Sequence, residues 1–221
     1  MDSTSRKILI LGASGLIGRF VTDDLRTRGF QAIGVARLLT PSQKTSAFDL
    51  ELPVMSMDAA SLARLIRERE IDVVVNCLGV LQDGPGSDTR AVHRDFVECL
   101  LAAIRDGGRR ARLIHISIPG TADGDHTAFS VTKREAERLI AASGIAYAIL
   151  RPGFVVAPSA YGGSAMLRAL AVFPLQLPAD ASATPLQPVA VGGIANTIAW
   201  LAARVIDNSA THAGKSAFVQ P

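Results

Sequence analysis

Short apolar runs alternate with longer amphipathic stretches along most of this chain. The runs with the length and apolar character of strands are Lys7–Leu11, Gln31–Ala36, a poorly marked run within Ala47–Met57, Asp72–Cys77, Arg112–Ser117 and Ala146–Leu150. The stretches with the spacing of helices are Leu16–Arg28, Ala60–Arg69, Thr89–Asp106, Phe129–Ala142, Ala165–Ala171 and Val191–Ile206. This alternation predicts an α/β fold built on a mostly parallel sheet.

The most apolar runs, Val73–Val75 and Leu113–Ile116, are typical of central parallel strands that helices cover on both faces. Right-handed crossovers then predict a single doubly wound Rossmann domain over residues 1–221, with strand order 3-2-1-4-5-6. Residues after about 151 are expected to form a reduced substrate-side lobe. Ligands of such sheets bind at the carboxyl ends of the strands, beside the switch point between the first and fourth strands.

The turn after the first run has the pattern Gly-x-x-Gly-x-x-Gly between a strand and a helix. Gly12 permits the tight turn, Gly15 lets the backbone approach a diphosphate, and Gly18 allows the helix to pack closely on the strand. The N–H groups of Gly15 and of the first helical residues are expected to face this anion at the positive end of the helix dipole. The turn therefore predicts a dinucleotide site that includes Ser14, Gly15, Leu16 and Ile17.

The second strand ends at Arg37, where an NAD site carries an acid that accepts a hydrogen bond from the ribose 2′-OH. No acid occurs between Asp24 and Asp49, whereas Arg37 and Lys44 both lie in that interval. A cation at this place would pair with a 2′-phosphate through charge-assisted hydrogen bonds. The sequence therefore favours NADP(H) over NAD(H), and the alternative is that Arg37 is a solvated surface residue.

Composition and charge argue against a nucleic-acid partner. The net charge of the 221 residues is only +3, and the densest basic cluster is expected at a helix end, where cations complement the helix dipole and face water. That cluster consists of Arg105, Arg109, Arg110 and Arg112. The N-terminus lacks an apolar signal segment and no apolar run reaches about 18 residues, so we expect no membrane contact by this chain itself.

Cys77 and Cys99 lack the spacing of metal ligands and lie in apolar surroundings. Both are typical of reduced core cysteines. We therefore expect no metal site and a cytoplasmic protein, associated with an inner membrane only if the chain is part of a longer protein. The oligomeric state stays open.

Five features occur in the order typical of the short-chain dehydrogenase/reductase superfamily. They are the glycine pattern, Asn76–Gly79 after the fourth strand, Ser117 after the fifth, Lys133 on the next helix, and Arg151–Gly153 after the sixth. Across essentially its whole length the chain resembles the extended and atypical branches, the NAD-dependent epimerase/dehydratase-like proteins. More narrowly, Asn76–Leu81, Val92–Asp95 and Phe129–Ala136 resemble bacterial NAD(P)-binding proteins related to a subunit of respiratory complex I. Some of those are fused to a DoxX-like membrane region.

The resemblance implies roles for several residues. The segment with Asn76, Cys77 and Gly79 would lie over the adenosine ribose, and Lys133 would hydrogen-bond the nicotinamide ribose hydroxyls. The nicotinamide amide would be lined by Arg151, Pro152, Gly153, Phe154 and Val155. The alternative for Lys133 is a solvated helix residue in a charge-rich run.

The chain departs from the superfamily's catalytic pattern. Active members pair the lysine with a tyrosine four residues earlier, one helical turn away, so that the ammonium lowers the pKa of the phenol. That position is Phe129, which cannot exchange a proton. The slot of a second serine, two residues past Ser117, is Pro119, and a helix asparagine of the proton relay is replaced by His93.

These departures leave two hypotheses. The first is an NADP(H)-binding accessory or sensor domain without the ordinary carbonyl-reduction cycle. The second is a divergent oxidoreductase or epimerase that uses Ser117 and Lys133 and takes its proton from another group. The candidates for that group are Tyr161, His93, His126 and His115. Of these, Tyr161 lies in a loop that could reach the nicotinamide, whereas His115 in mid-strand is expected to be a hydrogen-bonded core residue.

The substrate side offers mostly apolar residues, namely Phe154, Val155, Tyr161, Met166, Leu170 and Phe173. They suit an apolar or quinone-like ring better than a nucleotide sugar, unless they only close the core over the end of the sheet. The last segment, Gly214–Pro221, resembles a final strand of relatives that continue beyond it. We expect a minimal member or part of a longer protein, and an edge strand at Ala217–Val219 whose deletion costs about 1–3 kcal/mol.

Overall fold

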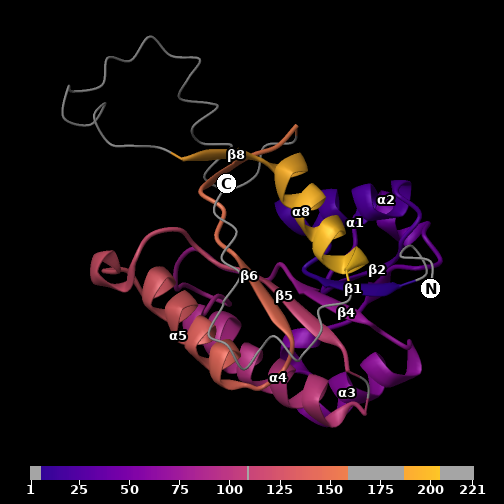
Figure 1. The fold of residues 1–221 in the computed structure, drawn as a ribbon, viewed down its shortest axis with the longest axis horizontal. Helices are drawn as coiled ribbons and strands as arrows, with labels where there is room; N and C mark the ends of the chain where they lie inside the picture. Colours follow the sequence, from indigo (N-terminus) through magenta and orange to yellow (C-terminus); the bar gives the residue numbers. More distant parts are fainter. Residues whose placement is uncertain (1–5, 109, 159–186, 205–221) are drawn as a thin grey trace.

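The computed structural model describes residues 6–108, 110–158 and 187–204. Its main sheet is parallel, with the order β3-β2-β1-β4-β5-β6 (Figure 1). The strands are β1 (Lys7–Leu11), β2 (Gln31–Ala36), β3 (Leu50–Glu51), β4 (Val73–Asn76), β5 (Arg112–Ile116) and β6 (Tyr147–Leu150). The predicted fold class and strand order are confirmed. β1 and β4 lie side by side, so the switch point is at the carboxyl ends of these two strands.

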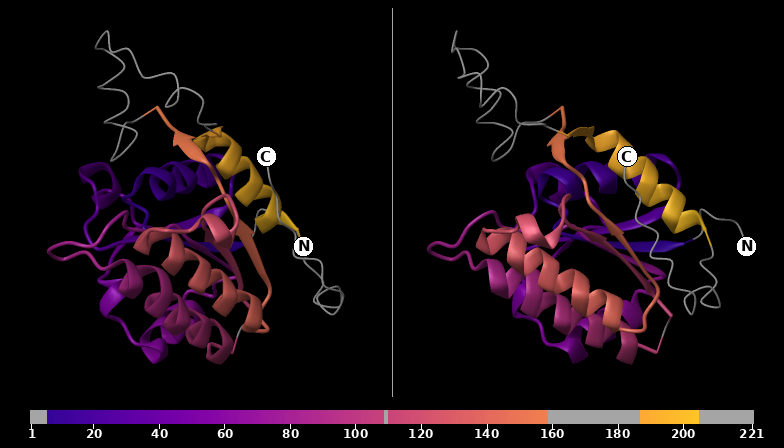
Figure 2. Two further views of the ribbon diagram at one scale, coloured as in Figure 1. Left: turned by 90° about the vertical axis from the view of Figure 1, so that its left-hand side faces the viewer. Right: turned by 60° about the vertical axis from the view of Figure 1, so that its left-hand side comes forward.

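Helices cover both faces of this sheet (Figure 2). One layer consists of α3 (Ala59–Glu68), α4 (Phe96–Asp106) and α5 (Ala128–Ala142). The opposite layer consists of α1 (Leu16–Thr27) and α8 (Val191–Ala203). A short helix, α2 (Pro41–Lys44), follows β2. Every helix in the described ranges is too short or too polar to span a lipid bilayer.

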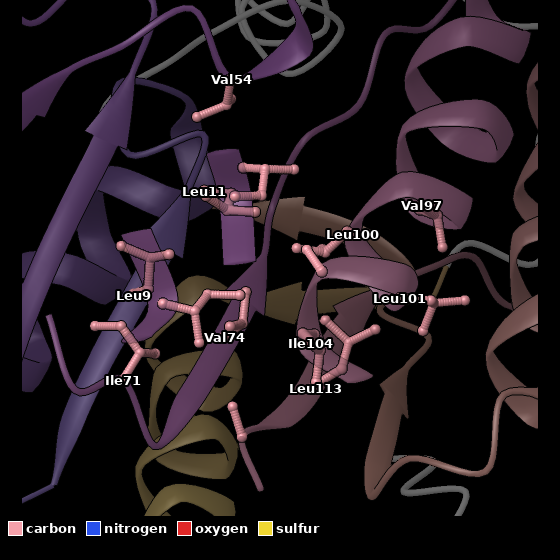
Figure 3. Close-up of a cluster of buried hydrophobic side chains, with 14 of the residues drawn as sticks. Leu9, Leu11, Val54, Ile71, Val74, Val97, Leu100, Leu101, Ile104 and Leu113 are labelled. Carbon is pink, nitrogen blue, oxygen red and sulfur yellow. The ribbon is translucent and has the colours of Figure 1, made fainter. Parts of the chain in front are cut away.

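Alternate residues of each strand enter two different cores. Leu9 points toward the layer of α3, α4 and α5, whereas its neighbour Ile8 packs with α1 and α8. Figure 3 shows the first core, where Leu9 and Val74 of the sheet face Leu100 and Ile104 of α4. Burying a side chain of this size stabilises the fold by about 1.5–3 kcal/mol. Strands buried on both faces need apolar residues at every position, which explains the unbroken apolar runs.

The element boundaries differ from the predicted ones in a few places. The expected helix Thr89–Asp106 contains a π-helical turn over Ala91–Asp95, a feature that often marks functional sites. The third strand shrinks to two residues because a 3₁₀ turn, Val54–Ser56, follows it. Other short elements were not predicted either: α2, a 3₁₀ turn over Ala122–Gly124, and the two parallel strands β7 (Phe154–Val156) and β8 (Pro188–Ala190). The expected helix Ala165–Ala171 lies outside the described residues, as does the expected C-terminal strand.

The basic cluster is a solvated face only in part. Arg105 and Arg110 are exposed as predicted, but Arg112 is buried and its guanidinium donates to the carbonyl oxygens of Leu201, at 2.7 Å, and Arg204. These carbonyls lie at the C-terminal end of α8, where backbone acceptors lack partners within the helix. Burial lowers the pKa of Arg112, and the nearby charge of Arg6 lowers it further. Arg112 is therefore a helix-capping residue of the core.

Candidate functional site

A cleft of about 970 Å³ lies at the carboxyl ends of β1, β4, β5 and β6. This volume is at the upper end of the range typical of small-molecule and cofactor sites, about 300–1,000 Å³. Most of the predicted site residues line it, namely Gly15, Leu16, Ile17, Cys77, Gly79, Ser117, Lys133, Pro152, Gly153, Phe154 and Val155. Phe129, four residues before Lys133 on α5, lines it as well.

Other predicted residues do not line the cleft. They are Gly12, Ser14, Gly18, Arg37, Asn76 and Arg151. Conversely, the cleft is also lined by Leu78, Val80–Pro85 and Ser87 after β4, and by Ile116, Ile118 and Pro119 at the end of β5. Sequence reasoning missed most of these loop residues because irregular segments have no periodic signal. Tyr161 lies outside the described residues.

The glycine turn has the tight geometry that its sequence predicts. Gly12 has φ +83°, a left-handed conformation that favours glycine. A Cβ on Gly18 would lie 2.2 Å from the carbonyl oxygen of Gly12, so only glycine lets α1 approach β1 this closely. A Cβ on Gly15 would meet only the same oxygen, at 3.3 Å. One detail was wrong: the N–H of Gly15 donates to the oxygen of Gly12 at 3.0 Å and does not face an anion.

The N-terminus of α1 is suited to an anion. No side chain caps it and its first turn contains no acid, while Leu16 and Ile17 line the cleft. Uncapped N–H groups and the positive end of the helix dipole form an anion site. A side-chain hydrogen bond holds the turn in place, since Gln43 of α2 donates to the carbonyl oxygen of Ala13 at 2.8 Å. These features fit the pyrophosphate of a dinucleotide.

The acid bonded to the second strand, Asp49, is occupied by partners within the fold. Asp49 has a fully buried carboxylate that accepts from the N–H of Gly34 at 3.0 Å and pairs with Arg26 at 2.6 Å. Glu51 lies beside the end of β2, but its carboxylate accepts from the N–H of Leu39 at 2.9 Å. Arg37 follows β2 directly and is exposed. The exposed residue that directly follows β2 is therefore a cation.

Two buried side chains organise the carboxyl end of β4. Asn76 accepts from the N–H of Leu78 at 3.1 Å, and its amide nitrogen lies 3.2 Å from Nδ1 of His115. Asn76 therefore holds the backbone of the loop that follows β4 and lines the cleft. His115 is the hydrogen-bonded core residue that we predicted, and burial keeps the pKa of its ring well below the ordinary value.

Lys133 points into the molecule and not into water. Its ammonium donates to the carbonyl oxygens of Ile116, at 2.9 Å, and Leu78, at 3.3 Å, which end β5 and follow β4. Burial lowers the pKa of Lys133 to about 8. Burial also raises the pKa of the nearby Cys77 thiol to about 12, so that Cys77 is a neutral group in the cleft wall.

Phe129 and His93 form an aromatic pair beside this lysine. Their rings meet edge to face with centroids 5.3 Å apart. Nε2 of His93 accepts from the N–H of Val80 at 3.0 Å, which assigns the ring proton to Nδ1, 2.9 Å from the Thr132 hydroxyl. Burial lowers the pKa of His93 to about 3.

Both nitrogens of His93 are thus engaged, and His93 does not line the cleft. Its ring fixes the loop after β4 to α5 and is not placed to supply a proton to a substrate. The other histidine candidate, His126, lies away from the cleft lining as well. Ser117 is different, since its buried hydroxyl lies in the lining. It helps to lower the pKa of Glu137 without meeting that carboxylate at hydrogen-bond geometry.

Comparison with known proteins identifies relatives of this fold. The sequence matches the family model of NAD(P)H-binding proteins over residues 12–171. No curated protein sequence matches the chain. Similar solved structures include the UDP-glucose 4-epimerase of Thermus thermophilus in complex with NAD, at 18% identity and a TM-score of 0.70 over 90% of this chain and 75% of that one.

Another similar structure is MoeE5 with UDP-glucuronic acid and NAD, at 22% identity and a TM-score of 0.72 over 91% of this chain and 73% of that one. A third is TunA, an NAD-dependent NDP-hexosamine 5,6-dehydratase involved in tunicamycin biosynthesis, at 18% identity and a TM-score of 0.70 over 92% and 74%. These neighbours share the fold of this chain, so the expected resemblance to NAD-dependent epimerase/dehydratase-like proteins is confirmed at the level of the fold. The chain belongs to the NAD(P)H-binding family.

Proposed function

We propose that this protein binds NADP(H) in the cleft and works as an accessory or nucleotide-sensing domain without the ordinary carbonyl-reduction cycle. The observation that carries this proposal is the pair formed by Phe129 and Lys133. Phe129 lines the cleft one helical turn before the lysine, and a phenyl ring cannot give or take a proton. The ammonium that would activate a phenol is instead hydrogen-bonded to two backbone carbonyl groups.

Several features of the cleft support dinucleotide binding. The uncapped N-terminus of α1 would hold the pyrophosphate, and the backbone of residues 152–155 would hold the nicotinamide amide. An ammonium has three donors, and two of those on Lys133 are used, so one is left for a ribose hydroxyl. When bound, the nicotinamide would supply hydride-transfer chemistry. The chain itself binds and orients it.

The preference for NADP(H) rests on the end of β2. Arg37 is exposed there, and the buried Asp49 is committed to Arg26 and Gly34. A guanidinium pairs with a phosphate through charge-assisted hydrogen bonds, whereas a ribose 2′-OH offers it no charge. We therefore expect a 2′-phosphate to be recognised by Arg37.

Thermal-shift titration tests this proposal. A ligand at a hundredfold excess over its Kd stabilises the folded state by about 2.7 kcal/mol, and we expect a larger shift with NADPH than with NADH. Arg37→Glu should weaken NADPH binding about tenfold to a hundredfold without weakening NADH binding, since an acid at this place can accept from the ribose 2′-OH, while Arg138→Glu makes the same charge change on an exposed part of α5. Equal shifts with both nucleotides in the wild type would contradict the preference.

Gly15→Val tests the pyrophosphate assignment separately. A Cβ on Gly15 would meet one atom only, the Gly12 carbonyl oxygen at 3.3 Å, so the variant should fold after a small local shift, but its side chain would occupy the cleft lining. We expect both nucleotides to lose their stabilising effect. A folded Gly15→Val protein that still binds NADPH would mean that the pyrophosphate lies elsewhere.

The second candidate function is a divergent NADPH-dependent oxidoreductase or epimerase. It is favoured by the Ser117 hydroxyl in the cleft and by apolar lining residues such as Leu81 and Phe154, which would suit an apolar or quinone-like substrate. Sugar nucleotides are a competing class, because MoeE5 was solved with UDP-glucuronic acid. NADPH oxidation assayed with a quinone, and the conversion of UDP-glucose assayed in the presence of NADP+, would separate the two classes, because a quinone accepts hydride whereas a sugar hydroxyl donates it.

A further inference from the structure

A network of buried charges lies behind the cleft, and the proposed function does not use it. Its members are Arg134 and Glu137 on α5 and Arg151 at the end of β6, which we call the α5 charge network. Arg134 and Glu137 are buried and Arg151 is half-buried, and none of the three lines the cleft. Each, however, is bonded to a segment that does.

Arg134 holds the loop after β5. Its Nη2 donates to the carbonyl oxygens of Pro119, at 2.6 Å, and Gly120, at 2.9 Å, and its Nη1 donates to that of Ile118 at 3.1 Å. Nε donates to Asp125 at 3.0 Å. One guanidinium thus binds three successive carbonyl groups of this loop. Ile118 and Pro119 of the same loop line the cleft. Lysine, with a compact ammonium, cannot reproduce this planar set of bonds.

Glu137 joins this loop to the end of β6. Its carboxylate accepts from Arg134 at 3.2 Å and forms a bidentate pair with Arg151, at 2.9 Å from Nε and 2.6 Å from Nη2. Arg151 directly precedes Pro152 and Gly153, which line the cleft. Burial by itself would raise the pKa of Glu137, but the hydrogen bonds and charge of Arg151, together with Ser117 and the charge of Arg134, outweigh it and lower the pKa. The carboxylate is therefore charged when the protein is folded.

A buried ion network is an expensive way to gain stability, because the desolvation of each charge offsets the attraction between them. What such a network provides is a fixed geometry, since bidentate guanidinium–carboxylate pairs fix both the distance and the angle between the two side chains. Here these hydrogen bonds hold two loops, the one after β5 and the one after β6, against the same face of α5. Both loops are walls of the nicotinamide side of the proposed site.

We propose that Arg134, Glu137 and Arg151 are positioning residues that set the spacing of these two loops and thereby the affinity for the nicotinamide half of the dinucleotide. This inference rests on the proposed function. The adenosine half would bind at α1 and β2, whereas the hydrogen bonds described above join the α5 charge network to the loop after β5 and to the end of β6. Weakening the network should therefore affect one half of the ligand and spare the other.

Isothermal titration with two probes tests the inference. NADPH reports on the whole site, and adenosine 2′,5′-bisphosphate reports on the adenosine half alone. Glu137→Gln keeps the shape of the side chain but removes its charge. We expect its Kd for NADPH to rise about tenfold or more, since a displaced wall misaligns the ligand, while its Kd for adenosine 2′,5′-bisphosphate stays within about twofold of the wild type.

Arg138→Gln is the matched control, because Arg138 is the next residue along α5 and is exposed. It should change neither Kd. Arg151→Lys keeps the positive charge but loses the bidentate pair, so it should repeat the Glu137→Gln result even if that variant fails to fold. Circular dichroism melts establish that each titrated variant is folded.

Two results would overturn the inference alone. One is a folded network variant that binds NADPH as the wild type does. The other is an equal loss of affinity for both probes, which would indicate a general structural role. A wild-type protein that binds neither probe would overturn the proposed function, and this inference with it.

Discussion

At the residue scale, Phe129 carries the proposal that the cleft lacks the usual proton donor. The side chain lines the cleft four residues before Lys133, so the two share one face of α5. The rest of the neighbourhood is consistent with a phenol at this place, because Ser117 and Lys133 both line the same cleft. A single substitution should therefore add the missing group.

We predict that Phe129→Tyr gains NADPH-dependent reduction of a reactive quinone. A nearby ammonium favours the ionised phenol and lowers its pKa, which makes proton exchange near neutral pH accessible. The measurement is NADPH oxidation, followed by the loss of the reduced nicotinamide's absorbance, with Phe129→Leu as the control that adds no proton donor. Substantial wild-type turnover that Phe129→Tyr leaves unchanged would instead support the divergent-enzyme hypothesis.

The buried Lys133 makes stability depend on pH. Burial lowers its pKa to about 8 from the ordinary 10.5, so between these values the folded protein has released a proton that the unfolded chain keeps. Since the unfolded state then binds more protons, the free energy of unfolding rises with pH. Relative to Lys133→Met, we expect the wild type to gain up to about 3 kcal/mol between those two pH values in urea unfolding. A constant difference across that range would contradict the shift.

At the scale of elements, the glycine turn and α1 act as one unit. The close approach of α1 to β1 depends on Gly18, whose missing Cβ leaves room for the carbonyl oxygen of Gly12. That oxygen also accepts from the N–H of Gly15, so a shift of the helix would distort the turn that faces the cleft.

We predict that Gly18→Ala lowers the free energy of unfolding by about 1–3 kcal/mol and also weakens NADPH binding. The added methyl would lie 2.2 Å from a backbone oxygen that the turn itself holds in place. Gly192→Ala in α8 is the control, because nothing lies within 4 Å of its Cβ position; it should be neutral or stabilise by up to about 1 kcal/mol. Equal melting temperatures for Gly18→Ala and the wild type would show that α1 can move away from β1 without a loss of stability.

At the scale of the whole molecule, α8 connects the end of the described chain to its beginning. It packs beside α1 on one face of the sheet (Figure 2), and Arg6 and Arg112 donate to carbonyl groups at its C-terminal end. The face of the sheet that α8 covers includes Ile114 and Ile116 of β5. This helix is therefore part of the core although it lies beyond residue 186.

We predict that a chain ending at residue 186 does not fold cooperatively. It loses the burial of Val191, Ile194, Ile198 and Leu201, together worth about 6–12 kcal/mol, which is comparable with the whole stability of a typical domain. Thermal unfolding followed by circular dichroism should show no sharp transition, in contrast to the full chain. A sharp transition at an unchanged temperature would mean that the rest of the sheet folds without α8.

Much of the fold could be predicted from the sequence because its signals are local. The run Lys7–Leu11 and the glycines that follow it predict strand, turn and helix within a few residues of one another. The short strands β7 and β8 escaped prediction for the same reason, since three residues are too few to show a period. Arg112 was predicted to face water because its charge is visible in the sequence, whereas its acceptors at Leu201 and Arg204 are far away along the chain.

The sequence by itself determined the order of strands and helices, the glycine turn and the absence of a phenol at Phe129. These properties depend on residue identity and short spacing, which folding does not alter. Only the tertiary structure decided the partners of the buried polar groups. Asp49 pairs with Arg26, and His93 is hydrogen-bonded to Val80 and Thr132. Arg134 is hydrogen-bonded to the loop after β5. A buried donor or acceptor must find a partner because leaving it unpaired is costly, and that partner is chosen by distance in space, which spacing along the chain does not encode.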